Sequence, residues 1–512
     1  LALIKRENPL PAICGRVCNR RCEDACTRGR VDAAVAIDEV KKFIAQRDLD
    51  AATRYVPPVV TPTRAGGFDQ KIAIIGAGPA GLSCAFYLAE KGYKPVVFEK
   101  NERPGGMLTY GIPSFKLQKD VIEAEVEVIR LMGAEFRYGV EVGRDVTLDE
   151  LRAQGFKAFY VAIGCQGGRL AGIPGEDAED VTVAVDFLRE VNSGKIDALP
   201  GRTIVVGGGN VAIDVARNAC RLGSEHVEMF CLESEAQMPA SEEERREAIE
   251  DGAHISCGWG PKEIHLDEAG RVCGITFKRC TRVFDDEGRF APEYDENDLR
   301  RVDADRVVMS IGQSIVWGDL LAGSKVELGR GQGALADPQT YQTAEPDIFV
   351  GGDVYTGPSF AIDAIAAGHE AAVSIHRFVQ PGSTLTIGRN QRRYTALDRD
   401  DVVIESYDNA SREVARVDRE REKAAPFSEY VETFTEEQVR AETARCLGCG
   451  ASIVDPNKCI GCGLCTTKCA FDAIHLDRDR PECSTMVKYE QKLPSLGKYA
   501  LKRAIKIKFG KK

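Results

Sequence analysis

The chain has 512 residues, of which 43% are hydrophobic and 29% are charged, as in an ordinary globular protein. This length accommodates about three or four domains with hydrophobic cores of their own. The formal net charge of −11 argues against general nucleic-acid binding, and no apolar run approaches the roughly 20 residues that a membrane-spanning helix needs. The 18 cysteines gather mainly near the two ends at short spacings, which favours metal ligation in a reducing cytoplasm over disulfides.

The first group of cysteines lies in PAICGRVCNRRCEDACTRG. Its members stand four residues apart, at Cys14, Cys18, Cys22 and Cys26. Gly15 favours short helical pieces joined by turns over one continuous helix. Four thiolates at this range suit an iron–sulfur cluster or a zinc ion, and the spacing does not separate the two metals. We expect this helical domain to span residues 1–66 and to end in the linker VPPVVTPTRAGG.

A strand, a glycine turn, a helix and a second strand are predicted in KIAIIGAGPAGLSCAFYLAEKGYKPVVFEK. In the G-x-G-x-x-G turn, Gly76 permits the tight turn and Gly78 lets the backbone approach a pyrophosphate, while Gly81 lets the helix pack close to the strand. The N–H groups at the start of the helix attract phosphates. Glu99 ends the second strand and can accept a hydrogen bond from a ribose hydroxyl. This stretch predicts a dinucleotide site.

A second unit of the same kind follows in GRTIVVGGGNVAIDVARNACRLGSEHVEMFCLE, with the accepted variant G-x-G-x-x-A. Two sites imply two dinucleotides, and a flavin with a nicotinamide is the pair that can exchange a hydride. Glu233 lies at the end of the second strand, where a carboxylate suits the 2′-hydroxyl of NAD and would repel the 2′-phosphate of NADP. The residues expected to contact NAD are Gly207, Gly208, Gly209, Asn210, Val211, Glu233 and Gly312.

Three further segments support these units. Strands are predicted to end in glycine at Gly164 and Gly312. In DIFVGGDVYTGPSFAIDAIAAGHEAA, a strand leads to Asp353 and a helix starts at about Ser359, with its positive end toward an electron-rich flavin edge. Asp353 either holds ribityl hydroxyls or simply caps a helix, and the Gly-Gly-Asp context favours the ligand role.

The second group of cysteines lies near the end of the chain. CIGCGLCTTKC is C-x2-C-x2-C-x3-C, the spacing that presents thiolates to a [4Fe–4S] cluster. The group comprises Cys446, Cys449, Cys459, Cys462, Cys465, Cys469 and Cys483. Seven cysteines are one short of two complete sets, so a second cluster here needs a non-cysteine ligand or a distant thiol. The other cysteines, expected to be buried thiols, are Cys84, Cys165, Cys220, Cys231, Cys257, Cys273 and Cys280.

The order of these segments resembles the glutamate synthase small-subunit family, together with the flavoprotein part of dihydropyrimidine dehydrogenase and the large subunit of ferredoxin:NADP transhydrogenase. The resemblance covers residues 7 to about 376 and includes FEKNERPGGMLTYGIP. It implies an N-terminal iron–sulfur domain and an FAD domain interrupted by an NAD(P)H domain. Members bind two N-terminal clusters with further cysteines ahead of Cys14, so we expect residues to precede Leu1.

We therefore predict an α/β protein with two Rossmann-like domains, an N-terminal α-helical iron–sulfur domain and a C-terminal ferredoxin-like [4Fe–4S] domain. Predicted boundaries are 67–200 with 313–385 for FAD, 201–312 for NAD(H), 386–440 for a polar linker, 441–485 for the ferredoxin-like module and 486–512 for a basic tail. Expected FAD contacts are Gly76, Gly78, Pro79, Ala80, Gly81, Glu99, Lys100, Gly105, Gly106, Met107, Leu108, Gly164, Gly352, Asp353, Ser359, Phe360 and Ala361.

Two departures from this family favour NADH. Its NADPH-using members carry Tyr-Arg-Arg where this chain has Cys-Leu-Glu at 231–233, and Arg-Arg after Met-Pro-Ala where this chain has Ser241 and Glu242. Arg245 and Arg246 fit an ordinary solvated helix face better than a displaced phosphate clamp.

The predicted function is electron transfer between NADH and one-electron carriers, with FAD and at least two [4Fe–4S] clusters. NADH would give a hydride to FAD, and clusters, ferredoxin or other subunits of a redox complex would exchange single electrons. No residues for acid–base catalysis are expected. The basic tail could dock on an acidic partner, lie on a membrane surface or be disordered; docking is preferred. The alternatives are a glutamate synthase small subunit using NADPH and a non-catalytic electron-transfer scaffold.

Overall fold

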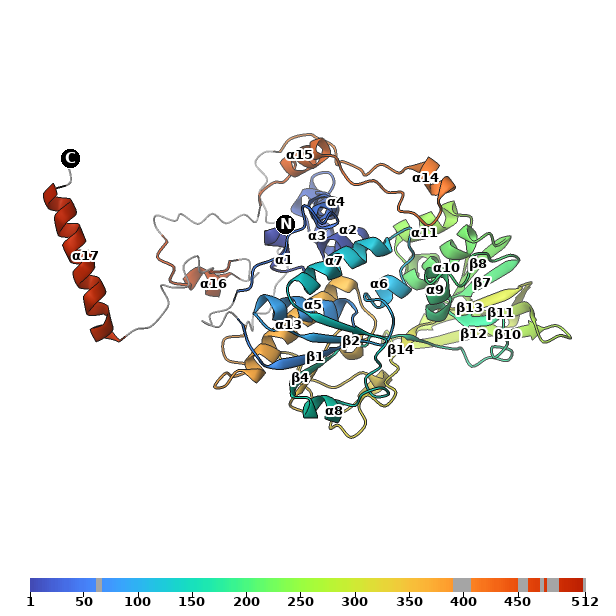
Figure 1. Ribbon diagram of the computed structural model, residues 1–512. Coiled ribbons are helices and arrows are strands. Elements are labelled where there is room, and N and C mark those ends of the chain that lie inside the picture. Colours follow the sequence, from blue (N-terminus) through green and yellow to red (C-terminus); the bar gives the residue numbers. More distant parts are fainter. Residues whose placement is uncertain (61–66, 390–406, 450–458, 470–473, 477–487, 510–512) are drawn as a thin grey trace. The chain divides into compact units, whose positions relative to one another are not determined.

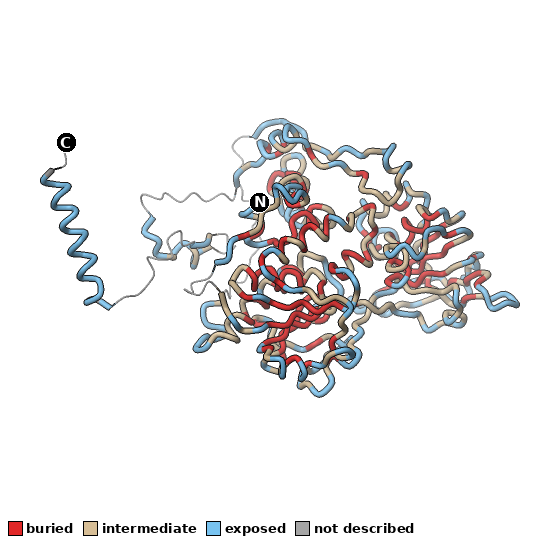
Figure 2. The backbone as a smooth tube through the Cα atoms, viewed as in Figure 1, coloured by how far each residue is buried: buried red, intermediate tan, exposed pale blue. Residues whose placement is uncertain are grey.

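The computed structural model describes residues 1–60, 67–389, 407–449, 459–469, 474–476 and 488–509. The chain forms a main unit of residues 1–389 with 403–449, and a C-terminal unit of residues 390–402 with 450–512 (Figure 1). Figure 2 shows that the strands inside the main unit are largely buried, whereas the C-terminal helix is exposed along its length.

The first sheet of the main unit is parallel and has the strand order β15-β4-β1-β2-β3. Its strands are β1 (Lys71–Ile75), β2 (Val96–Glu99), β3 (Glu135–Tyr138), β4 (Phe156–Val161) and β15 (Ile348–Val350). Its helices are α5 (Pro79–Glu90), α6 (Met107–Tyr110), α7 (Lys119–Leu131), α8 (Leu148–Ala153), α12 (Asp353–Thr356) and α13 (Ala361–Val379). Apart from the edge strand β3, the strands are largely apolar because both faces of a parallel sheet are covered.

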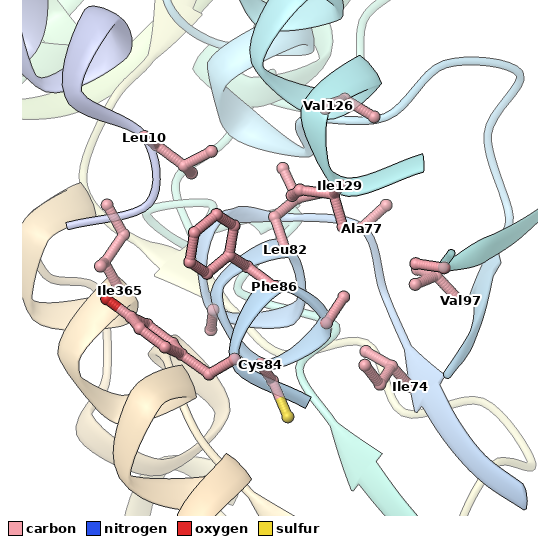
Figure 3. Packing of buried hydrophobic residues seen from close by; sticks show 14 of the residues in the cluster. Leu10, Ile74, Ala77, Leu82, Cys84, Phe86, Val97, Val126, Ile129 and Ile365 are labelled. Atoms are coloured by element: carbon pink, nitrogen blue, oxygen red, sulfur yellow. The ribbon is translucent and has the colours of Figure 1, made fainter. Parts of the chain in front are cut away.

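The core of this domain forms where α5 packs between the sheet and its neighbouring helices. Figure 3 shows Ile74 and Val97 from the sheet facing Leu82 of α5, and all three side chains are fully buried. Phe86 of α5 and Ile365 of α13 extend the same cluster. The two glycine-rich segments that begin α5 and precede α13 are therefore held by one rigid core.

The second sheet is also parallel, with the order β6-β13-β7-β8-β9. Its elements are β6 (Val181–Val183), α9 (Ala184–Asn192), β7 (Arg202–Val206), α10 (Asn210–Arg221), β8 (His226–Cys231), η3 (Glu235–Gln237), α11 (Glu242–Glu250), β9 (His254–Cys257) and β13 (Arg306–Met309). An antiparallel sheet of β10 (Trp259–Leu266), β11 (Val272–Phe284) and β12 (Phe290–Val302) packs against it. Phe230 stacks on Phe277 at 3.9 Å between ring centroids.

The start of the second domain corrects the predicted boundary at residue 201. Strand β6 pairs with β13, and Phe187 and Leu188 of α9 belong to the core of the second domain. The short ribbon of β5 (Gly167–Gly168) and β14 (Gln313–Ser314) lies where the chain enters and leaves this domain. From the sequence, the boundary was placed at the start of the second glycine-turn unit. The amphipathic pattern of α9 shows that this helix covers a sheet, but it does not show which of the two sheets it covers.

The N-terminal domain consists of short helices: α1 (Ala2–Lys5), α2 (Pro11–Val17), α3 (Arg21–Asp24), η1 (Thr27–Arg30), α4 (Ile37–Ala45) and η2 (Gln46–Asp48). The first backbone N–H groups of α2 need acceptors because they have no partner within the helix. Buried Glu125 of α7 accepts from Ala12 and Ile13 at 2.8 and 2.9 Å. This carboxylate ties the N-terminal domain to the first sheet.

Residues 407–449, which we call the strap, belong to the main unit, whereas the sequence assigned residues up to 440 to a polar linker and residues from 441 to the ferredoxin-like module. The strap contains α14 (Arg419–Ala424) and α15 (Glu436–Ala444), and it runs from beside α4 to beside α11 (Figure 1). Tyr430 and Phe434 are buried. In the sequence, residues 407–440 resemble a solvated linker because many of them are charged. The residues that pair with these charges are distant in the sequence.

The C-terminal unit contains α16 (Leu464–Lys468) and α17 (Tyr489–Phe509) in its described residues. Apolar side chains of α17, among them Leu493 and Leu501, are exposed. No helix in the described ranges is both long enough and apolar enough to cross a membrane.

Candidate functional site

A cavity of about 1160 Å³ lies in the main unit, and both predicted glycine turns open on it. It is larger than the roughly 300–1,000 Å³ of a typical small-ligand pocket. The predicted contacts that line it are Gly76, Gly78, Pro79, Ala80, Glu99, Lys100, Gly106, Met107, Leu108, Gly164, Gly207, Gly208, Gly209, Asn210, Val211, Glu233, Gly312, Gly352, Asp353, Ser359, Phe360 and Ala361. Residues predicted from separate motifs thus share one cavity.

The first glycine turn has the geometry that a pyrophosphate requires. Gly76 has a φ of +103°, and a Cβ there would lie 2.4 Å from the carbonyl oxygen of Ala162. A Cβ on Gly81 would lie 2.0 Å from the carbonyl oxygen of Gly76, so Gly81 serves helix packing and does not line the cavity. A Cβ on Gly78 would meet no protein atom within 4 Å. The space beside Gly78 is open for a ligand.

Glu99 joins this turn to the loop that follows β2. Its carboxylate is 3% exposed and accepts the N–H of Ala77 at 2.8 Å. The other carboxylate oxygen accepts the backbone N–H of Asn101 at 2.9 Å. A carboxylate has about four acceptor sites, so Glu99 can still accept from a ribose hydroxyl in the cavity.

Gly105 and Gly106 shape the next segment of the lining. Gly105 has a φ of +108° and lies outside the cavity, where a Cβ would meet the Thr109 hydroxyl oxygen at 2.3 Å. Gly106 has a φ of +55°, and its Cβ position is 3.1 Å from the Cα of Gly78. Gly105 therefore shapes the turn, while Gly106 brings the backbone beside the first glycine turn.

Asp353 lines the cavity and does not cap α13, so its role as a ligand for ribityl hydroxyls stays a prediction. Its carboxylate accepts the N–H of Ser359 at 3.2 Å and also faces the cavity. Burial raises the pKa of Asp353 to about 6. Helix α13 begins at Ala361, close to the predicted start, and no side chain caps its first N–H groups. These N–H groups are available to a ligand, as a flavin edge requires.

The second glycine turn brings Glu233 to the nucleotide-binding surface. Gly207 has a φ of +146°, and a Cβ there would lie 2.3 Å from the carbonyl oxygen of Ser310. A Cβ on Gly209 would meet no protein atom within 4 Å. The Glu233 carboxylate lies 3.0 Å from the Cβ position of Gly208. The carboxylate therefore sits directly beside the turn that is expected to hold the dinucleotide.

The two arginines near this site lie away from the cavity. Arg245 donates to the backbone carbonyl of Glu235 at 2.7 Å. Arg246 is 65% exposed and lies 3.8 Å from Glu250. No arginine lines the cavity among the described residues, and its lysines are Lys100 and Lys278.

The sequence missed an aromatic part of the lining, contributed by the antiparallel sheet. These side chains are Trp259, Phe290 and Tyr294, with Trp317 from the loop after β14. Lys278 lies 4.1 Å above the Tyr294 ring and donates to Glu296 at 2.8 Å. An aromatic residue in a strand is typical of core packing, so nothing local marks these residues as cavity lining.

A buried ion-pair cluster joins the two nucleotide-binding domains. Lys116, before α7, lies 2.6 Å from Asp214 of α10 and also pairs with Glu244 of α11. Burial raises the pKa of Asp214 to about 6, although the Lys116 ammonium opposes the shift. Asp214 lines the cavity, so this cluster fixes the second glycine-turn helix against the first domain.

The cysteines of the N-terminal domain lie on separate short elements. Cys14 in α2 is buried and donates to Asn8 at 3.8 Å, and burial raises its pKa to about 12. Cys22 is exposed. In the part of the chain that the structure describes, no three Cys, His, Asp or Glu side chains converge as metal ligands do. The role of these cysteines as ligands therefore stays a prediction.

The C-terminal cysteines are divided between the two units. Cys446 and Cys449 are exposed at the end of the strap. Cys459, Cys462 and Cys465 are exposed around α16 in the C-terminal unit. Cys483 lies outside the described residues.

Comparison with known proteins identifies the domains. Residues 70–368 match the pyridine nucleotide-disulphide oxidoreductase family. The chain belongs to this family. Residues 1–53 match the 4Fe-4S domain II of dihydropyrimidine dehydrogenase, and residues 452–475 match a 4Fe-4S binding domain. The oxidoreductase is thus FAD-dependent and carries iron–sulfur domains on both sides of its nucleotide-binding core.

The chain is 34% identical to the beta subunit of NADP(+)-dependent formate dehydrogenase from Moorella thermoacetica, over 88% of this chain and 66% of that protein. It is 35% identical to the small chain of NADPH glutamate synthase from Escherichia coli K12, over 74% of this chain and 82% of that protein. For PreT, an NAD-dependent dihydropyrimidine dehydrogenase subunit of the same strain, the values are 33%, 74% and 84%. The chain thus spans just under two thirds of the formate dehydrogenase subunit.

Among solved structures, FprA from Mycobacterium tuberculosis matches with a TM-score of 0.53 and 19% identity, over 61% of this chain and 85% of that chain. This likeness supports the fold. The resemblance to the glutamate synthase small-subunit family and the α/β fold class with iron–sulfur domains at both ends are confirmed.

Proposed function

We propose that this protein is the NADH-oxidising subunit of a redox complex and transfers electrons between NADH and one-electron iron–sulfur carriers. The observation that carries the proposal is the single cavity on which both glycine turns open. A hydride can pass between two dinucleotides only if their reactive rings meet. One shared cavity satisfies this requirement, whereas two separate pockets would not.

The first half of the cavity suits FAD. We propose that the turn from Gly76 to Gly81 and the start of α5 hold its pyrophosphate, that Glu99 holds the adenosine ribose, and that Asp353 holds ribityl hydroxyls. When bound, FAD supplies the chemistry that accepts a hydride and releases electrons singly. The protein residues bind and orient the nucleotides, and α13 directs its positive end toward the cavity.

The second half suits NADH. Glu233 lies beside the second glycine turn, where it would repel a 2′-phosphate. No arginine among the described lining residues would offset this repulsion. The similar proteins differ in the nucleotide that their names give, NADP(H) for two of them and NAD for another. The proposed preference for NADH therefore rests on Glu233 and its surroundings.

The partners that we propose are other subunits or a ferredoxin. The chain resembles a formate dehydrogenase beta subunit and a glutamate synthase small chain. A chain that carries iron–sulfur domains at both ends suits a role in which electrons continue to another protein.

The test is anaerobic reduction of the reconstituted holoprotein, followed by flavin absorbance with NADH and NADPH in parallel. We expect NADH to bleach the flavin much faster than NADPH. A faster reaction with NADPH would overturn the NADH assignment and favour a function like that of the NADPH glutamate synthase small chain. Failure of both nucleotides to bleach a fully FAD-loaded protein would favour a non-catalytic electron-transfer scaffold.

A further inference from the structure

Two thiols meet at the edge of the second parallel sheet. Cys231 ends β8 and Cys257 ends β9, and the two residues are partners in the parallel register. Their Sγ atoms lie 3.7 Å apart, and neither cysteine is in a disulfide. The sequence predicts both as buried thiols and does not indicate a contact between them, since 25 residues separate them. The sheet brings them into contact.

The geometry of this pair allows a disulfide. Neighbouring strands lie about 4.8 Å apart, and disulfides join Cα atoms about 4.4–6.8 Å apart. Register partners direct their side chains to the same face of a sheet. The two sulfurs therefore need to close only from 3.7 Å to about 2.0 Å, which small side-chain rotations can supply.

The pair is linked directly to Glu233 at the proposed nucleotide site. The Cys231 thiol donates to the backbone carbonyl of Glu233 at 3.7 Å. The N–H of Gly258, which follows Cys257, donates to the same carbonyl at 2.9 Å. The Cβ of Cys231 also lies 2.8 Å from the Cβ position of Gly208 in the second glycine turn. A change at either thiol should therefore shift the second glycine turn and the Glu233 carboxylate, both of which line the cavity.

We propose that Cys231 and Cys257 form a reversible redox pair and that its oxidation by a low-molecular-weight disulfide weakens nicotinamide nucleotide binding. The consequence for binding rests on the proposed function of the cavity. Cys257 is half-buried whereas Cys231 is 2% exposed, so the oxidant reaches Cys257 first. Burial and the neighbouring Cys257 raise the pKa of Cys231, which suits it to react second.

The exchange balances in two steps. The Cys257 thiol loses its proton and attacks the small disulfide, forming a mixed disulfide and releasing one small thiol. The Cys231 thiol then loses its proton and its thiolate attacks the Cys257 sulfur; the protein disulfide forms, the mixed disulfide breaks, and the leaving sulfur takes up a proton to give the second small thiol. Two protein thiols are oxidised and one small disulfide is reduced. The product lacks the S–H group that donates to Glu233.

The test uses the holoprotein, treated anaerobically with glutathione disulfide or left reduced. Peptide mass mapping without reductant should show a peptide containing Cys231 joined to one containing Cys257. The dissociation constant of the nucleotide that the reduced protein binds should rise about fivefold or more, as expected for the loss of one hydrogen bond with local rearrangement. Dithiothreitol should reverse both changes.

Two variants separate this pair from other thiols. Cys257→Ser should form no such disulfide, and its nucleotide affinity should not respond to glutathione disulfide. Cys280→Ser is the matched control and should respond like the wild type, because its thiol donates elsewhere, to the carbonyl of Arg282. Absence of the joined peptides in the wild type, or their formation with an unchanged dissociation constant, would overturn the proposal. Peptide mapping does not depend on which nucleotide the protein prefers. A failure of the NADH assignment can therefore be distinguished from a failure of the redox-pair proposal.

Discussion

At the scale of single residues, a carboxylate and a few glycines carry most of the proposed recognition. In the proposed function, Glu233 is the residue whose charge would separate NADH from NADPH, because it lies beside the second glycine turn. The glycines of the first turn differ from one another in what surrounds them. Gly81 faces protein atoms, whereas Gly78 faces open space.

Replacing Glu233 with Ala should remove the repulsion of a 2′-phosphate and the acceptor for the ribose hydroxyls. We expect kcat/KM for NADH to fall about tenfold or more, since hydrogen bonds to charged groups contribute about 1.5–3 kcal/mol, and kcat/KM for NADPH to rise. Steady-state kinetics with both nucleotides measures this. Glu235→Ala is the control, because Glu235 is exposed and does not line the cavity. An unchanged ratio in Glu233→Ala would contradict the assignment.

Alanine at Gly78 and at Gly81 should have different effects. Gly78 has a φ of −76° and a ψ of 179°, which alanine adopts readily, so the apoprotein should keep its stability while FAD affinity falls. Gly81→Ala places a methyl group 2.0 Å from a carbonyl oxygen and should lower both stability and FAD affinity. Thermal unfolding of apoprotein and FAD titration measure the two effects. Equal loss of stability in both variants would show that Gly78 is also needed for packing.

At the scale of elements, the strap is attached by buried charges. Arg445 and Glu442 are both fully buried and lie 2.6 Å apart. Glu442 also accepts the N–H of Ala36 at 2.8 Å, and Arg445 lies 3.0 Å from Asp32. These contacts attach the end of α15 to the N-terminal domain, next to the exposed Cys446.

Glu442→Gln should destabilise the main unit because the buried Arg445 guanidinium loses its fully buried carboxylate partner and keeps only the exposed Asp32 among its described carboxylate partners. Breaking a buried pair typically costs about 3–5 kcal/mol, and denaturant unfolding should show a loss that approaches this range. Glu436→Gln lies in the same helix but pairs with Arg440 in an exposed position, where about 0–1 kcal/mol is expected. Similar losses in the two variants would mean that the strap is not held by the buried pair.

At the scale of the whole molecule, the nucleotide domains and the N-terminal domain are joined by contacts distant in sequence. Lys116 links the first domain to α10 and α11. Glu429 of the strap lies 2.8 Å from Lys42, while Tyr430 accepts from Arg217 of α10 at 2.7 Å. The strap thus bridges the N-terminal domain and the second nucleotide-binding domain of the main unit.

Lys116→Met should loosen the fit between the two nucleotide domains while leaving both glycine turns intact. We expect flavin reduction by saturating NADH to slow about tenfold or more, because a small misplacement of reacting groups is costly, with little change in NADH affinity. Lys116→Arg should restore part of the rate. Stopped-flow absorbance separates the two quantities. A change in affinity alone would contradict a role in domain alignment.

The short-range structural units of this protein could be predicted from its sequence alone. Both strand–turn–helix units, the packing role of Gly81 and the start of a helix near Ser359 were predictable because short-range sterics and periodicity define them. The cysteine spacing likewise predicted the C-terminal 4Fe-4S segment, whereas at the N-terminus it left iron–sulfur and zinc open and the family resemblance implied iron–sulfur.

The contacts between these units could be found only in the folded structure. The shared cavity, the aromatic lining from Trp259 and Tyr294, and the contact between Cys231 and Cys257 arise from pairings between strands distant in the chain. Residues 407–440 of the strap were predicted as part of a linker because a charge such as Glu429 looks solvated until its partner, Lys42, is known. Such contacts leave no local pattern in the sequence, since burial and pairing are properties of the folded chain.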